Sequence, residues 1–262
     1  MTSETFFRQI YSDLLLKGQV VSPRGLKVLE IENYNYIVPA YVRFANFKSR
    51  KLNIGYIKQE FLWYLKGNKF DTSIAQHAKM WNNFINADGS INSNYGNYIF
   101  AELKQFDIVV NILLRDKESR RASIIILQSQ HLDSLYDVPC TYSFNFRIRK
   151  DKLNMTIRMR SQDAYLGMSS DIPCFSFIHE MVLHTLKEYY LDLTIGEYYH
   201  SADSFHLYEK NLVTVNKMIA GDEFIEYDCP RIHDHNEVKF LRKLDFTNIP
   251  DNYLFTKWLI EK

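Results

Sequence analysis

The sequence predicts an α+β fold in which a central, mostly antiparallel sheet is flanked by helices, and the period of its apolar residues carries this prediction. Residues 5–17 (TFFRQIYSDLLLK) place apolar side chains at helical spacing, and so do residues 174–191. Between these stretches, residues 141–149 (TYSFNFRIR) alternate between apolar and polar side chains, which is typical of a strand with one buried face. Helices and sheet would then bury their apolar faces against one another as layers.

The other elements follow from the same periods and from glycine stop signals. We expect helices over residues 5–17, 57–67, 73–86, 98–114 and 174–191, the first two ending at Gly18 and Gly67. We expect strands over residues 26–32, 36–42, 121–127, 141–149 and 153–160, and a pair of strands over residues 193–208. The last 40 residues are too weakly patterned to assign.

Length and composition indicate one ordinary globular domain spanning residues 1–262. Hydrophobic residues make up 46% and charged residues 24%, and only 9 glycines and 6 prolines leave little material for flexible linkers. The 32 Lys and Arg residues nearly cancel the 31 Asp and Glu residues, so no broad nucleic-acid-binding surface is expected. Neither glycine-rich phosphate-loop motif occurs.

The cysteines and the short apolar runs favour a reduced, cytoplasmic setting with no membrane contact. Cys140, Cys174 and Cys229 are odd in number and lack metal-site spacing. No apolar run approaches the roughly 20 residues that span a bilayer, and the N-terminus lacks the basic start and apolar stretch of a signal peptide. In such a setting a lone cysteine can act as a nucleophile.

Two histidine-containing stretches resemble metal-binding motifs, but neither supports a metal. His179, Glu180 and His184 resemble the HExxH motif of zinc proteases, yet five residues on a helix turn the two imidazoles by about 500° onto different faces. Residues 233–235 (His-Asp-His) lie in a polar stretch, where a solvated loop is the simpler interpretation. We therefore expect no metal site.

Cys140 stands in a more informative place, because it directly precedes the alternating strand 141–149. A generic cysteine is more often a small buried apolar residue. Here, however, Arg160 ends the next expected strand, and Arg120 and Arg121 form a second basic pair. Guanidinium groups match phosphate oxygens bidentately, and their charge would favour the thiolate over the thiol. The sequence thus indicates a nucleophile beside a phosphate pocket.

The residues around Cys140 carry a resemblance to a known family. Residues 138–172 combine Pro-Cys, a strand, a short turn, a second strand ending in Arg-Ser-x-Asp, and Leu-Gly. This segment resembles the core signature of the thymidylate synthase family. Four further segments are similar in the family's order, namely QEFLWYLKGN (59–68), KMWNNFINADGSINSNYG (79–96), SRRASIIIL (119–127) and FHLYEKN (205–211). The resemblance, from about residue 5 to residue 211, implies the thymidylate synthase-like fold.

The resemblance implies a pyrimidine nucleotide site. Cys140 would add to C6 of the ring, Glu60 would organise waters and proton transfers, and Tyr95 would lie close to C5. The residues implied for the 5′-phosphate are Arg160, Ser161, Arg120 and Arg121, and those for the sugar 3′-hydroxyl are His206 and Tyr208. In the family the arginine pair comes from the neighbouring subunit, which implies a homodimer with two shared sites.

The resemblance also implies a folate site, with 5,10-methylenetetrahydrofolate as the co-substrate. The residues implied to line this site are Trp81, Asp163, Leu166 and Gly167. Asp163 would also hydrogen-bond the pterin ring, which places it among the catalytic residues with Cys140.

Two departures from the family pattern point to a cytosine base. Thymidylate synthases follow the nucleophile with His, whereas this chain has Thr141, and they read uracil with an Asn where this chain has Asp171. A carboxylate can accept from the cytosine N4 amino group and from a protonated N3, but an ionised carboxylate cannot donate to uracil O4. Each mismatched buried polar group costs roughly 1–3 kcal/mol. In an unknown family, a loop-capping Asp would be the simpler interpretation.

Both departures, together with residues 91–96 (INSNYG), resemble the deoxycytidylate hydroxymethylase branch of the family. Two features fit the family less closely. The family's N-terminal phosphate arginine lies two residues before a glycine, whereas here Pro23 holds that position and Arg24 directly precedes Gly25. The family's C-terminal lid is not evident in residues 255–262 (FTKWLIEK).

The sequence therefore predicts an enzyme that converts dCMP, 5,10-methylenetetrahydrofolate and water to 5-hydroxymethyl-dCMP and tetrahydrofolate. Thr141 is smaller than His, and residues 92–94 bring polar side chains near Tyr95, so an ordered water could be the final reactant.

Three alternatives stay open at this point. A C5-methylating synthase that makes 5-methyl-dCMP or dTMP, and a CMP hydroxymethylase, would use the same fold. The non-enzyme alternative is a family member that binds nucleotide or RNA without catalysing a reaction. The non-enzyme alternative is disfavoured because the catalytic residues implied by the resemblance are all present, namely Cys140, Glu60, Arg160 and Asp163.

Overall fold

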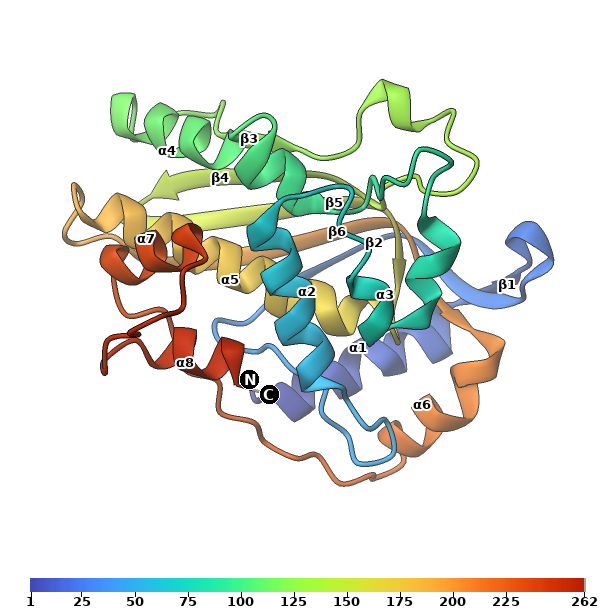
Figure 1. Cartoon of the computed structure of the whole chain (residues 1–262). Helices are drawn as coiled ribbons and strands as arrows, with labels where there is room; N and C mark the ends of the chain where they lie inside the picture. The colour runs from blue at the N-terminus through green and yellow to red at the C-terminus, as the bar shows by residue number, and fades with distance from the viewer. Residues whose placement is uncertain (262) are drawn as a thin grey trace.

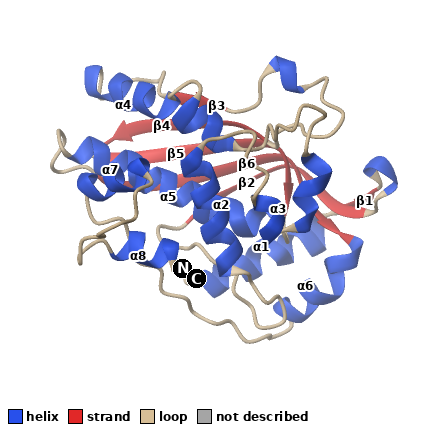
Figure 2. Cartoon of the chain, viewed as in Figure 1, coloured by secondary structure: helices blue, strands red, loops and turns tan. Residues whose placement is uncertain are grey.

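The computed structural model describes residues 1–261, and its centre is a six-stranded sheet with helices packed in front of it in the view of Figures 1 and 2. The strands, in the spatial order β1-β2-β6-β5-β4-β3, are Gln19–Val21, Val28–Val38, Thr194–Tyr208, Lys152–Asp163, Thr141–Arg149 and Ser123–Ile125. Every neighbouring pair is antiparallel except β5 and β6, which run parallel. The predicted α+β class and the mostly antiparallel sheet are therefore confirmed.

Eight α-helices are assigned within residues 1–261. They are α1 Ser3–Lys17, α2 Ile54–Lys66, α3 Ile74–His77, α4 Gln105–Arg115, α5 Gly167–Lys187, α6 Leu212–Ile219, α7 His235–Lys243 and α8 Leu254–Ile260. Short 3₁₀ segments are η1 Pro23–Gly25, η2 Lys79–Phe84, η4 Ser129–His131 and η5 Glu209–Asn211, and η3 Asn97–Ala101 is a π-helix. In this part of the chain, no helix combines the length and the apolar character that a membrane crossing needs.

Two strand predictions were wrong in the same way, because each divided one continuous strand. The strands expected over residues 26–32 and 36–42 form the single strand β2, and residues 39–42 lie outside it. The pair expected over residues 193–208 is the single strand β6, which is hydrogen-bonded to β2 on one edge and β5 on the other. The polar middle of β6, including His200 and Ser201, is buried between these neighbours rather than turning at the surface.

Two predicted helices are each interrupted. Residues 73–86 divide into α3 and η2 because Ala78 between them is extended at φ −146°. Residues 98–114 divide into η3 and α4 because Lys104 adopts a left-handed conformation at φ 46°. The short strand β1 and the C-terminal helices α6 to α8 were not predicted.

The core lies between α5 and the sheet, and aromatic side chains join its parts. Phe175 of α5 meets Phe144 of β4 edge to face at 4.7 Å between ring centroids, and Phe177 meets Phe255 of α8 at 4.9 Å. Phe255 and Trp258 are both buried. The segment 254–260 is therefore part of the core in this structure.

A close backbone contact sets the position of Tyr95. A Cβ atom on Gly96 would lie 1.7 Å from the carbonyl oxygen of Tyr64 in α2, so only glycine fits. The contact brings the Tyr95 ring onto that of Tyr64, stacked at 5.5 Å and 20°. This packing ties one candidate catalytic side chain to the helix that carries another, Glu60.

Candidate active site

The strand pairing gathers candidate residues at one end of the sheet. Cys140 directly precedes β4, and Arg160 and Ser161 lie near the end of β5, which is antiparallel to β4. Because β6 runs parallel to β5, Asp163 pairs with His206 near the end of β6. The backbone N–H of Arg160 donates to the carbonyl of Cys140 at 2.8 Å, which places nucleophile and arginine side by side.

Backbone carbonyls orient the Arg160 guanidinium toward the cysteine. Its Nε donates to the carbonyl of Pro139 at 3.0 Å, and its Nη2 donates to that of Val138 at 2.6 Å. The same Nη2 lies 3.6 Å from the Cys140 Sγ. Since these partners are neutral, the positive charge stays available to an anion.

Burial raises the pKa of the Cys140 thiol above its ordinary value. Arg160 and Arg24 lower this pKa, whereas Asp171 and Asp137 raise it. The charge of Arg160 favours the thiolate, as expected, but lost hydration outweighs it in the free site and the net shift favours the thiol. A general base must accept the thiol proton.

Glu60 on α2 is a buried carboxyl with a pKa raised to about 7. Burial raises the pKa, and the nearby hydroxyls of Ser170, Tyr56 and Tyr64 oppose the shift. Tyr56 donates its hydroxyl hydrogen to Glu60 Oε1 at 3.0 Å and accepts from Trp81 Nε1 at 2.9 Å. Glu60 Oε2 is buried without a protein partner. A carboxyl that titrates near neutral pH with one free oxygen can both take up and release protons.

Asp171 lies in the N-terminal part of α5 and is 8% exposed. Burial raises its pKa well above the ordinary value, and the charges of Glu60 and Asp163 raise it further. Gln162 Nε2 donates to Asp171 Oδ2 at 3.3 Å, which lowers the pKa in part. Asp171 also raises the pKa of Cys140, so the carboxyl is close enough to the nucleophile to interact with it. The net result favours a protonated Asp171.

The polar residues before Tyr95 serve a structural role. The backbone N–H and the hydroxyl of Ser93 donate to the Asp137 carboxylate at 2.7 and 2.5 Å, and Asn92 Nδ2 donates to the Asp137 carbonyl at 2.9 Å. Asn92 and Ser93 are therefore bonded to Asp137 and do not hold the expected water, whereas Asn94, the third residue of that expectation, keeps a buried Oδ1 without a hydrogen-bond partner. The Thr141 hydroxyl is also buried, and it lies near Tyr95.

The turn between β5 and α5 carries the residues expected at a folate. Asp163 Oδ1 accepts from the backbone N–H groups of Tyr165 at 2.8 Å and Leu166 at 3.1 Å, which holds the turn. Leu166 is 42% exposed. Gly167 begins α5, and a Cβ atom there would lie 3.4 Å from Asp171 Oδ2. Trp81, the fourth expected folate residue, is buried and bonded to Tyr56 as described above.

The end of β6 brings two more candidates to this edge. The rings of His206 and Tyr208 meet edge to face at 5.3 Å, and Tyr208 pairs with Val28 at the start of β2. Arg24 lies just before β2, exposed and in a left-handed conformation at φ 54°. Its positive charge lowers the pKa of Cys140.

Arg120 and Arg121 are placed differently. Both are exposed in the connection between α4 and β3 and line an open groove together with Arg115 and Ile112. Within residues 1–261, no hydrogen bond joins either guanidinium to Cys140 or to any other group of the chain. One chain therefore does not bring this pair to its own nucleophile.

The histidine motifs have other partners. His179 Nε2 donates to the carbonyl of Leu153 at 2.7 Å, and burial lowers the pKa of this imidazole to about 4. Glu180 forms a buried ion pair with Arg43. No group of three or more His, Cys, Asp or Glu side chains among the described residues is placed to hold a metal.

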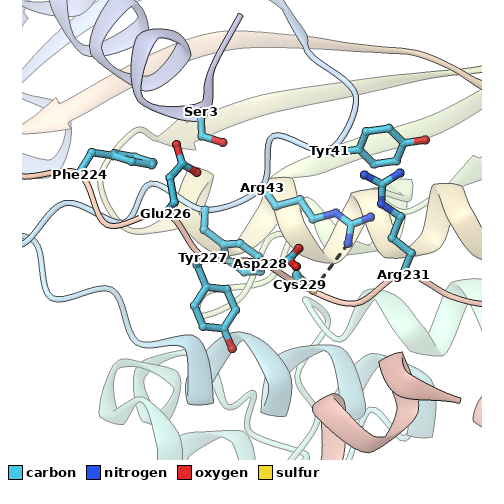
Figure 3. Close-up of a pocket in the computed structure, with 10 residues that line it drawn as sticks. Ser3, Tyr41, Arg43, Phe224, Glu226, Tyr227, Asp228, Cys229 and Arg231 are labelled. Carbon is cyan, nitrogen blue, oxygen red and sulfur yellow. Dashed lines mark hydrogen bonds between the residues drawn. The ribbon is translucent and has the colours of Figure 1, made fainter. Parts of the chain in front are cut away.

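A separate small pocket lies between the start of α1, residues 41–44 and residues 224–231 (Figure 3). Arg43 Nη1 lies 3.7 Å from Cys229 Sγ there, and burial raises the pKa of this thiol to about 11. A thiol held protonated is a poor nucleophile. The pocket shares no residue with the group around Cys140.

Sequence reasoning missed four residues that shape the site, namely Gln162, Tyr36, Tyr56 and Asp137. Tyr56 could have been found, because it lies four residues before Glu60 on the same helix and so shares its face. The Tyr36 hydroxyl donates to Gln162 Oε1 at 2.9 Å across 126 residues of chain, and no local pattern indicates such a pair.

Comparison with known proteins identifies the family. The thymidylate synthase family model matches residues 6–250. The chain belongs to the thymidylate synthase family. Members of this family are folate-dependent transferases that act at C5 of a pyrimidine nucleotide.

The relatives within the thymidylate synthase family differ in name. A thymidylate synthase of Buchnera aphidicola subsp. Acyrthosiphon pisum (strain Tuc7) is 28% identical over 206 residues, which cover 74% of this chain and 75% of that protein. The deoxycytidylate 5-hydroxymethyltransferase of Enterobacteria phage T4 is 27% identical over 226 residues, which cover 82% of this chain and 90% of that protein. Overall identity therefore does not separate the two activities, and the choice rests on the site.

Proposed function

We propose that this chain is a dCMP hydroxymethylase, which converts dCMP, 5,10-methylenetetrahydrofolate and water to 5-hydroxymethyl-dCMP and tetrahydrofolate. The observation that carries the proposal is Asp171, a buried carboxyl with a raised pKa that interacts with Cys140. It stands where the family resemblance leads one to expect the Asn that reads uracil.

A protonated Asp171 suits the hydrogen-bonding edge of cytosine. Its O–H can donate to N3, and its other oxygen can accept from the N4 amino group. N3 of cytosine is basic, so the proton can pass to the ring and leave a charge-assisted pair. Uracil carries a hydrogen on N3 and so offers no basic atom there, and it would pair with a protonated carboxyl only if the O–H faced O4 and the other oxygen faced N3. Asp171 would therefore favour cytosine and supply the proton that N3 needs when C6 is attacked.

The chain's own groups support covalent catalysis. The Cys140 sulfur would bond to C6, which makes C5 nucleophilic, and the same bond would break when product leaves. Glu60, with its pKa of about 7 and one unpartnered oxygen, suits the transfer of protons to and from C5. The charges of Cys140 and Asp171 both raise the pKa of Tyr95, which would lie beside the reacting ring.

The residues present fit a folate. Leu166 offers an exposed apolar side chain to a flat ring, and Gly167 follows it at the start of α5. Asp163 uses one carboxyl oxygen for the turn, so the other suits the N–H donors of a pterin. When bound, 5,10-methylenetetrahydrofolate supplies the one-carbon unit.

The phosphate site would be completed by a second copy of the chain. Arg160 and Ser161 would hold the 5′-phosphate from the same subunit, with Arg24 at its edge. Arg120 and Arg121 of the partner subunit would close the site, which suits their exposure and lack of partners here. His206 and Tyr208 would bind the sugar 3′-hydroxyl from the end of β6.

Thr141 supports water rather than hydride as the final reactant. Its buried hydroxyl lies directly after Cys140 and near Tyr95, so it suits a water held beside the reacting carbon. A larger imidazole in this place would fill that space.

The test is incubation of the protein with 5,10-methylenetetrahydrofolate and equal amounts of dCMP, CMP and dUMP, followed by mass spectrometry of each nucleotide. The proposal predicts that dCMP alone gains CH₂O at a substantial rate. Modification of CMP in preference would make the chain a CMP hydroxymethylase, and a gain of CH₂ would make it a methylating synthase. Binding of nucleotide with no turnover would indicate a silent member of the family.

A further inference from the structure

Two consecutive buried hydrogen bonds link Asp171 to Gln162 and Gln162 to Tyr36. The Tyr36 hydroxyl donates to Gln162 Oε1 at 2.9 Å, and Gln162 Nε2 donates to Asp171 Oδ2 at 3.3 Å. Gln162 is 2% exposed and Tyr36 is 9% exposed, so water does not compete for these bonds. The Tyr36 ring is itself fixed, because it stacks on His200 at 4.8 Å with an interplanar angle of 6°.

These two hydrogen bonds determine which way the Gln162 amide faces. An amide has a donor end and an acceptor end, and the Tyr36 hydroxyl donates to the oxygen end. The NH₂ end must therefore face Asp171. Its hydrogen bond commits Oδ2 as an acceptor and favours the carbonyl form of that oxygen, which leaves the proton on Oδ1. Among the described residues, Gln162 is the only side chain that hydrogen-bonds Asp171.

We propose that Gln162, held by Tyr36, is a positioning residue that sets base specificity by fixing the donor and acceptor oxygens of Asp171. This inference rests on the proposed function. With the proton on Oδ1 facing N3, Oδ2 accepts from the N4 amino group and cytosine is matched at both atoms. Uracil needs the reverse order, which requires a proton on Oδ2, where the Gln162 N–H already points. Buried polar groups in a fixed order discriminate because the wrong base leaves them unpaired.

The test compares kcat/KM for dCMP and dUMP in the wild type, Gln162→Met and Tyr36→Phe. Gln162→Met keeps the length of the side chain and removes its donor. We expect the dCMP:dUMP ratio to fall about tenfold, as for the loss of one hydrogen bond. Tyr36→Phe frees the amide to turn over and should lower the ratio by a smaller factor. The ratio does not depend on the fraction of folded enzyme, so a loss of stability does not obscure the result.

Tyr34→Phe is the matched control. Tyr34 lies on the same strand and its ring stacks on Phe205, but its hydroxyl donates to Asp13 and not to Gln162. The ratio should stay at the wild-type value in this variant. A ratio that is unchanged or higher in Gln162→Met overturns the role of Gln162, whichever base the wild type prefers. The wild-type ratio by itself tests the proposed function, so the two failures are distinguishable.

Discussion

Two regions of the proposed site differ in how completely one chain builds them. Around Asp171, buried partners come from the same chain, with Gln162 bonded to the carboxyl and Tyr36 bonded to Gln162. Arg120 and Arg121 instead lie exposed on an open groove, with no side-chain partner within residues 1–261.

The difference shows where each kind of recognition gets its energy. Base reading depends on the order of donors and acceptors, and this order must be fixed before the ligand arrives. Phosphate binding depends on charge, and a solvated guanidinium needs no preformed partner until the anion is present. In the proposed site, base specificity would therefore come from the interior of one chain, and phosphate affinity would come from a contact between two chains.

The largest expected effect is at the nucleophile. Cys140→Ser should lower turnover about 10³-fold or more while nucleotide binding persists, because a hydroxyl is far less readily ionised than a thiol. Steady-state kinetics and equilibrium binding of dCMP measure the two properties. Cys174→Ser and Cys229→Ser are the controls and should remain active. Near-normal turnover by Cys140→Ser would exclude covalent catalysis by this residue.

Complementation tests the arginine region. Arg120→Ala and Cys140→Ser chains, each inactive alone, should regain about a quarter of wild-type activity when mixed, since half of random dimers are mixed and each holds one complete site. Activity assays after subunit exchange measure the gain. If subunits exchange and no activity returns, the two groups do not meet across an interface.

The base-reading region predicts a smaller and more selective effect. Asp171→Asn should weaken turnover of dCMP and raise relative activity on dUMP. An amide can donate a hydrogen bond to O4 of uracil, but it has no acidic proton to give to N3 of cytosine. The expected change in the dCMP:dUMP ratio is roughly 10- to 100-fold. Competition between the two nucleotides measures it. An unchanged preference would mean that Asp171 does not read the base.

The last expected effect is on stability, through Glu60. Its pKa is about 7 in the folded chain against an ordinary value of 4.5. The folded state thus holds this proton more tightly, so the contribution to stability is present at low pH and is lost as pH rises from about 4.5 to 7. Glu60→Gln should remove this dependence, which amounts to about 3 kcal/mol at most.

Denaturant unfolding between pH 5 and pH 8 measures the effect of Glu60. Relative to Glu60→Gln, the wild type should lose stability as the pH rises. Glu118→Gln is the control, because Glu118 is exposed and lines the arginine groove. Parallel pH profiles for the wild type and Glu60→Gln would contradict the raised pKa of Glu60.

The sequence predicted those parts of the fold that have a local cause. Strand β4 matches its predicted bounds, residues 141–149, because the sequence alternates along it, and from Phe144 to Arg149 the apolar side chains are the buried ones. Strands β2 and β6 were each divided, because their polar middles are satisfied by neighbouring strands that a local pattern does not reveal. Helices α6 to α8 were missed because each is short and depends on the core it covers.

The site divides in the same way. Cys140, Arg160 and Asp171 could be selected from motif order, and the structure brings them together. The charge state of Cys140 could not be predicted, because burial opposes the arginines and burial is a property of the folded chain. No sequence pattern marks Gln162 as a positioning residue, because its role depends on Tyr36, which is 126 residues away in the chain.

The measurement that tests the central claim most directly follows both products of the reaction with dCMP in ¹⁸O-water. Every step up to the exocyclic methylene is shared with the methylating synthases, so only the final reactant separates the two chemistries. The account predicts a nucleotide heavier by CH₂O that carries the ¹⁸O label, and tetrahydrofolate with no rise in near-ultraviolet absorbance from dihydrofolate. Stoichiometric dihydrofolate and a nucleotide heavier by only CH₂ would contradict it.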